Sequence, residues 1–74
     1  MGKEEVFLKK WPITLAQFLK WQGWAENGAQ AKEMVKEGCA EINGEICLIP
    51  GKQLFPGDSI LFYPTEKEYS LKEE

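Results

Sequence analysis

The chain has 74 residues, of which 43% are hydrophobic and three are tryptophans, and its formal net charge is −3. This length supports one small core and excludes two domains, while the apolar content excludes intrinsic disorder. Because no apolar run reaches the roughly 20 residues of a membrane span and the first residues lack the apolar stretch of a secretory signal, we expect a soluble cytoplasmic protein.

Residues 15–22 are predicted to form the first helix. Thr14 and Gln17 occupy the N-cap and N3 positions of a capping box, in which each side chain bonds the backbone amide of the other residue. Gly23 supplies the positive φ that commonly ends a helix. One face of the helix is apolar at helical spacing, through Leu15, Phe18 and Leu19.

A second helix is predicted to start after Asn27, which is a favourable N-cap residue. Gln30 at N3 repeats the capping box, and Gly38 ends the helix. Its apolar face consists of Ala31, Met34 and Val35. Both helices are near the length at which isolated helices are unstable in water, so they must pack on other elements.

The remainder of the chain predicts short strands. Ala40–Ile42 leads into Asn43–Gly44, the strongest short signal for a hairpin turn, and residues 45–49 form the return strand. A strict two-residue turn places Ile46 on the wrong face of this hairpin. We therefore expect a bulge or a longer loop.

Residues 59–63 are predicted to form the last strand, and residues 6–8 a strand that pairs with it. Charged residues dominate after Pro64, so we expect residues 64–74 to fray as a tail. The predicted domain is then residues 1–63, with two helices followed by strands.

The net charge is located at the two ends of the chain. Residues 3–5 and 64–74 contain three lysines and six glutamates, which account for the whole −3. Between Val6 and Tyr63, six acids balance six lysines: Lys9, Lys10, Lys20, Lys32, Lys36 and Lys52. An acidic chain therefore still permits a local basic surface.

Two cysteines and the absence of histidine restrict the chemistry of the chain. Two thiols do not make a disulfide framework, and structural zinc rarely relies on carboxylates in place of histidine. We therefore expect Cys39 and Cys47 to be small buried hydrophobes, with no metal or cofactor. Since Asp58 is the single aspartate and no nucleophile–base pair is evident, the sequence argues against an enzyme or a small-molecule substrate.

Four short segments follow one another over about residues 13–60: ITLAQFL, GAQAKEMVKEG, AEING and LFPGDSI. Together with the order of the predicted elements, they resemble the S-four RNA-binding domain, also called the alpha-L motif. No segment is specific alone, but four in the correct order over about residues 13–60 are much more specific. The form of residues 28–32 is similar to the small stand-alone branch of the family, the YaaA/YbcJ-like proteins.

The resemblance implies an α+β domain in which two short antiparallel helices pack on a small, mostly antiparallel sheet. It also implies non-enzymatic binding of structured RNA, usually ribosomal or transfer RNA, and association with the ribosome. This chain departs from the family pattern because it has no arginine and carries Glu41 and Glu45 where basic residues are common. Without the guanidinium fork, RNA binding must rely on lysine, backbone amides and polar side chains.

The second helix carries the main candidate RNA-binding residues. Lys32 matches a family position and Lys36 lies one turn further on, although acids beside them also fit an ordinary solvated face. Asn27, Gly28 and Gln30 begin this helix, where free amides and the helix dipole suit a phosphate, although capping also explains the two polar side chains. Further candidate contacts come from Lys10, Lys20 and Lys52.

A second hypothesis is a protein-interaction module that kept the fold but lost the RNA-binding face. The acidic hairpin, the apolar segment ICLI and the tryptophans favour it. Trp24 fits core packing, whereas Trp11 and Trp21 fit either the edge of the core or base stacking. The sequence leaves both hypotheses open and names neither the RNA nor the protein partner.

Overall fold

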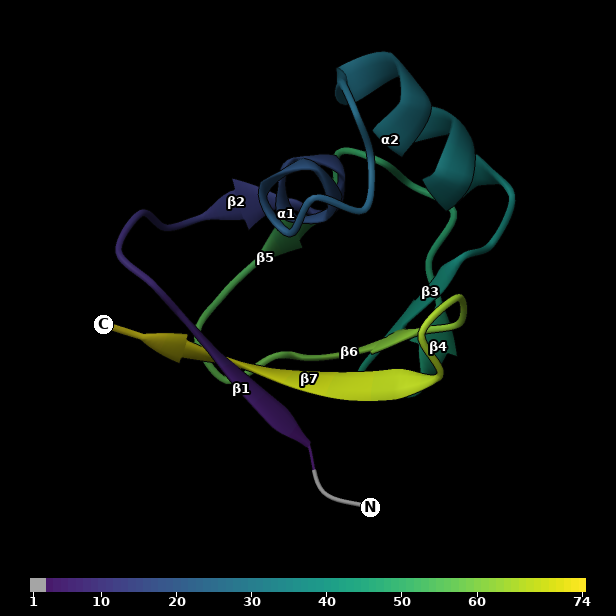
Figure 1. The fold of residues 1–74 in the computed structure, drawn as a ribbon. Helices are drawn as coiled ribbons and strands as arrows, with labels where there is room; N and C mark the ends of the chain where they lie inside the picture. Colours follow the sequence, from purple (N-terminus) through teal and green to yellow (C-terminus); the bar gives the residue numbers. More distant parts are fainter. Residues whose placement is uncertain (1–2) are drawn as a thin grey trace.

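A five-stranded sheet organises the fold, with the strand order β1-β7-β6-β3-β4 (Figure 1). The computed structural model describes residues 3–74. β1 pairs with β7 in parallel, and every other neighbouring pair is antiparallel. The expected α+β class with a mostly antiparallel sheet is therefore confirmed. The strands are β1 (Glu4–Leu8), β3 (Ala40–Ile42), β4 (Glu45–Ile46), β6 (Ser59–Phe62) and β7 (Lys67–Glu73).

Two further strands form a small separate sheet that fixes the start of the first helix. β2 (Ile13–Thr14) pairs antiparallel with β5 (Gln53–Leu54). The amide of Leu15 donates to the Lys52 carbonyl at 2.9 Å, and the next amide donates to the Pro50 carbonyl at 3.1 Å. The loop before β5 is thereby fastened to the first turn of the helix.

The two helices form where the capping signals predict them. α1 (Leu15–Trp21) has both bonds of its capping box, between Thr14 and Gln17, and it ends one residue earlier than predicted. In α2 (Gly28–Lys36) the Asn27 side chain accepts from the Gln30 amide at 2.8 Å, but the Gln30 side chain accepts from the amide of Glu26. Within residues 3–74, neither helix has the length and apolarity needed to span a membrane.

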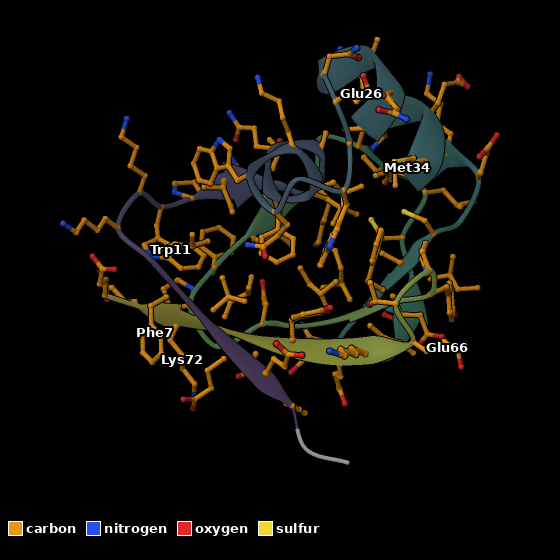
Figure 2. All side chains as sticks on the ribbon, in the orientation of Figure 1. Phe7, Trp11, Glu26, Met34, Glu66 and Lys72 are labelled. Atoms are coloured by element: carbon orange, nitrogen blue, oxygen red, sulfur yellow. The ribbon has the colours of Figure 1, made fainter. Side chains whose placement is uncertain are left out.

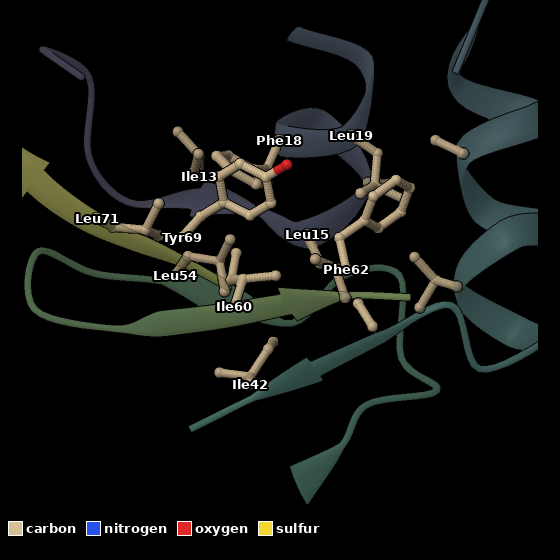
Figure 3. Packing of buried hydrophobic residues seen from close by; sticks show 14 of the residues in the cluster. Ile13, Leu15, Phe18, Leu19, Ile42, Leu54, Ile60, Phe62, Tyr69 and Leu71 are labelled. Atoms are coloured by element: carbon tan, nitrogen blue, oxygen red, sulfur yellow. The ribbon is translucent and has the colours of Figure 1, made fainter. Parts of the chain in front are cut away.

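The core lies between the helices and one face of the large sheet (Figure 1, Figure 3). The helices contact each other, and their axes cross obliquely in Figure 1. The Trp24 ring is stacked on Phe62, with ring centroids 4.0 Å apart and an interplanar angle of 10°, which confirms its packing role. The fully buried side chains of the core are Leu15, Phe18, Leu19, Ala31, Val35, Ala40, Leu54, Ile60 and Leu71.

The β3–β4 hairpin has a strict two-residue turn, so the predicted bulge or longer loop is wrong. Asn43 and Gly44 adopt φ of 52° and 90°, which is the backbone geometry that a tight hairpin turn requires. Glu41 consequently lies opposite Ile46, and the isoleucine side chain is exposed. The return strand ends at Ile46 rather than continuing to residue 49.

The charged C-terminal stretch does not fray, which corrects the prediction for residues 64–74. β7 lies between β1 and β6 and is hydrogen-bonded to both. Its alternate residues Tyr69 and Leu71 point inward and are buried, a pattern that the surrounding charges concealed in the sequence. β1 therefore pairs with β7, and not with β6 as predicted.

Candidate nucleic-acid interface

Some lysines form ion pairs with glutamates of the same chain, and within residues 3–74 the others do not. Lys3, Lys9 and Lys67 each pair with a glutamate, at N–O distances of 3.6, 3.4 and 2.9 Å respectively, and all three lie on or beside β1 and β7. Among the described residues, the lysines without a carboxylate within 4.0 Å are Lys10, Lys20, Lys32, Lys36, Lys52 and Lys72. Five of these six are the lysines that the sequence predicts as RNA contacts.

Those five lysines lie on α1 or on segments attached directly to it. Lys20 is in the last turn of α1, and Lys32 and Lys36 are exposed on α2, which packs against α1. Lys52 belongs to the loop that bonds the start of α1, and Lys10 lies just before β2. In Figure 2, nitrogen-tipped side chains extend into solvent from this helical side of the molecule.

The acid of β3, Glu41, faces away from this side. Glu41 alternates with the buried residues of β3, so its side chain lies on the face of the sheet that the helices do not cover. There it accepts a hydrogen bond from the Tyr63 hydroxyl, and that bond raises the pKa of the phenol above its ordinary value. On the helical side, Glu33 and Glu37 remain exposed beside the α2 lysines, so the α2 surface is mixed in charge.

The first turn of α2 presents free backbone donors, whereas that of α1 does not. In α1 the first amides bond the carbonyls of Lys52 and Pro50. In α2, within the described part of the chain, the amides of Gly28 and Ala29 have no acceptor. Asn27 accepts only from the amides of Gln30 and Ala31. An added Cβ at Gly28 meets no atom within 4 Å, so internal packing does not require this glycine.

The three tryptophans have different surroundings. Trp24 packs among three aromatic rings, and Trp11 donates its indole N–H to the Leu8 carbonyl at 2.9 Å. Trp21 is exposed on α1. It is the most exposed of the three tryptophans, and it follows the unpaired Lys20 in the chain.

The cysteines are half-buried rather than fully buried, and both thiols are free. Burial raises the pKa of the Cys39 thiol, which lowers its thiolate content and hence its nucleophilicity. Within residues 3–74, no cluster of three or more metal-ligating side chains is present.

The sequence interpretation named the apolar segment ICLI but missed Phe55, which joins it in one surface groove. The groove has a volume of about 380 Å³ and lies between the β3–β4 turn and the segment that leads to Asp58. Lys52 lies on its wall, beside exposed apolar side chains. The adjacency of a large apolar surface to one of the unpaired lysines follows from the tertiary fold and has no local sequence signal.

Comparison with known proteins agrees with this architecture. The chain is 32% identical over 50 residues to "Putative RNA-binding protein YbcJ" of Escherichia coli (strain K12), and the match covers 68% of this chain and 71% of that protein. "Uncharacterized protein YbcJ" of Shigella flexneri matches with the same identity and coverage. The model of the S4 domain matches residues 6–71, from β1 into β7. The chain therefore belongs to the S4 domain family.

Proposed function

We propose that this chain is a non-enzymatic module that binds structured RNA, either ribosomal or transfer RNA, in the cytoplasm. The observation that carries the proposal is the group of five lysines around α1 that have no internal carboxylate partner. Binding RNA phosphates releases counterions without first breaking an ion pair in the protein. The printed name of the Escherichia coli relative supports the same class of ligand.

Recognition then depends on phosphate position and RNA shape rather than on base edges. Lys32 and Lys36 lie one helical turn apart and contact neighbouring phosphates as point charges. The free amides of Gly28 and Ala29 dock a further phosphate at the positive end of α2. Because the chain has no arginine, affinity is modest and strongly salt-dependent. Neighbouring contacts within a ribosomal particle supply additional binding energy.

The test is binding of the full chain to purified ribosomal RNA and to transfer RNA across a salt series. We expect saturable binding whose logarithm falls linearly with the logarithm of salt concentration. The double variant Lys32→Gln/Lys36→Gln should bind more weakly, and its salt slope should decrease by roughly 0.7–0.9 for each lost phosphate contact. Fluorescence anisotropy with labelled RNA measures both quantities.

Lys72→Gln is the matched control, because Lys72 is also without an ion pair among the described residues but lies on β7. Its salt slope should equal that of the wild type. Equal weakening by Lys72→Gln and by the α2 variant contradicts the assignment of the surface. Absence of saturable binding at low salt, with the protein folded, contradicts the proposed function.

A protein-interaction role is the second candidate, and the apolar groove favours it. Exposed Ile46, Ile49 and Phe55 line that groove and suit an apolar partner better than a phosphate backbone. The groove and the unpaired lysines of the two helices are separate features, so one chain can use both.

A further inference from the structure

Four large apolar side chains are exposed together at the end of the sheet that β4 forms. Their exposed fractions are 59% for Ile46, 54% for Leu48, 64% for Ile49 and 49% for Phe55, and all four line the groove described above. A contiguous apolar patch of this kind on a small monomer commonly marks an interaction site.

The backbone beside this patch is also unpaired. β4 is the outermost strand of the sheet. In an antiparallel ladder, hydrogen-bonded residue pairs alternate with pairs that exchange no bond. The Cys47 amide donates to the Ala40 carbonyl at 3.1 Å, so the intervening pair of Glu41 and Ile46 is the non-bonded type. The N–H and C=O of Ile46 consequently point to the free edge of the sheet.

We propose that a second copy of this chain pairs along this edge and buries the apolar patch. Residues 45–49 can pair with the same residues of a second copy in an antiparallel register centred on Cys47, and this pairing extends β4 from Ile46, where it ends in one copy, to residue 49. In this register Ile46 lies opposite the partner's Leu48 and exchanges backbone hydrogen bonds with it. The two-fold symmetry of the dimer gives the same bonds between Leu48 and the partner's Ile46. Among the described residues, the N–H and C=O of Leu48 have no backbone partner that this pairing must displace.

No like charges oppose each other when a second copy pairs along this edge. In the proposed register, Glu45 lies opposite the partner's Ile49, so the two glutamates of the dimer do not oppose each other. The other sheet edge, β1, is protected: it begins with two glutamates, and Glu4 is held in an ion pair with Lys67. Charges of that kind are a common protection of edge strands against pairing.

The exposed area indicates a weak dimer. Large apolar side chains have roughly 150–200 Å² of surface, so four that are half exposed offer on the order of 350 Å² for each copy. Two copies together with their paired backbones approach ~1,000 Å², which is the lower limit for a specific interface. Association is therefore expected to be reversible and concentration-dependent. The groove that the dimer covers includes Lys52, one of the five candidate RNA-binding lysines, but the proposal does not rest on RNA binding.

The test is sedimentation velocity of the full chain from about 10 μM to about 1 mM, a range that covers weak dimers. The wild-type average mass should rise toward twice the monomer mass. Ile46→Lys should remain monomeric, because the substitution places a charge on the pairing edge next to its central residue, Cys47. Phe7→Lys is the matched control, since Phe7 is an exposed apolar residue on the opposite edge strand, and it should associate like the wild type.

Leu48→Glu provides a second variant, and circular dichroism establishes that each variant is folded. Amide hydrogen exchange of the wild type should slow at Ile46 and Leu48 as concentration increases. A wild type that stays monomeric throughout the range overturns the proposal and leaves the edge to a different protein. The proposal is also overturned if Phe7→Lys no longer associates, or if Ile46→Lys and Leu48→Glu both still associate.

Discussion

Trp24 joins the helical layer to the sheet through aromatic contacts on three sides. Its ring lies flat on Phe62, meets Phe18 edge-on with centroids 5.7 Å apart, and lies 5.0 Å from Tyr69. Such pairs each contribute about 0.5–1.5 kcal/mol beyond the burial of their area. Trp24 is partly buried, and removing its ring eliminates all three contacts and exposes the neighbouring aromatic rings to water.

Trp24→Ala is therefore expected to destabilise the protein by roughly 3 kcal/mol or more, whereas Trp21→Ala should cost under about 1 kcal/mol because Trp21 is exposed. Urea denaturation followed by circular dichroism measures both free energies of unfolding. Similar values for the two variants contradict the packing role of Trp24.

A substitution at Gly28 can test RNA binding without destabilising the fold. Its φ lies outside the positive region and an added Cβ has free space, so alanine at this first helical position fits the folded state. Gly28→Ala should leave the free energy of unfolding unchanged or raise it by up to about 1 kcal/mol. If a phosphate approaches the Gly28 amide as proposed, the added methyl should weaken RNA binding several-fold. Undiminished RNA affinity in a stable variant argues against phosphate docking at this site.

At the scale of the elements, the helices are local structures and β7 is not. An N-cap side chain and a glycine stop define each helix within about ten residues, with a complete capping box in α1 alone, so the sequence predicts both helices with little error. β7 is stable because β1 and β6 pair with it on either side, and neither contact leaves a local signal. The alternation of Tyr69 and Leu71 was present in the sequence, but six surrounding charges favoured a solvated tail.

Leu71→Ala tests whether β7 is an integral strand. Leu71 is fully buried on the inner face, so the substitution should cost roughly 2–5 kcal/mol. Lys72→Ala, one residue further on the opposite face, should change the free energy of unfolding by less than about 0.5 kcal/mol. Thermal or urea denaturation distinguishes the two, and a negligible cost at Leu71 supports the frayed tail instead.

The hairpin illustrates a conflict between turn chemistry and hydrophobic patterning. Asn43 and Gly44 favour a two-residue turn, while the apolar Ile46 favours a register that buries its side chain. The sequence interpretation gave priority to burial, but in the folded chain the turn determines the register and Ile46 is exposed. An exposed apolar residue is tolerable when another surface covers it, as the proposed dimer does.

At the scale of the whole molecule, the partners of the charges matter more than their sum. Lys3, Lys9 and Lys67, on or beside β1 and β7, form ion pairs. β3 places Glu41 on the uncovered face of the sheet. The family resemblance indicates Lys32 and Lys52 in the sequence, and the other candidate lysines are predicted from their positions on or beside the helices. The lack of internal ion-pair partners for all five depends on the fold. The groove beside Lys52 likewise combines segments that only tertiary structure brings together.

The parallel pairing of β1 with β7 has a kinetic consequence. Glu4 lies opposite Tyr69, so this contact joins residues from opposite ends of the described chain. Closing so long a loop costs more entropy than closing the β3–β4 hairpin, and high contact order slows folding. We infer that the helices and the hairpin assemble early, and that β1 joins the sheet only after β7 has paired with β6. The strand at the start of the sequence is then among the last to acquire its native contacts.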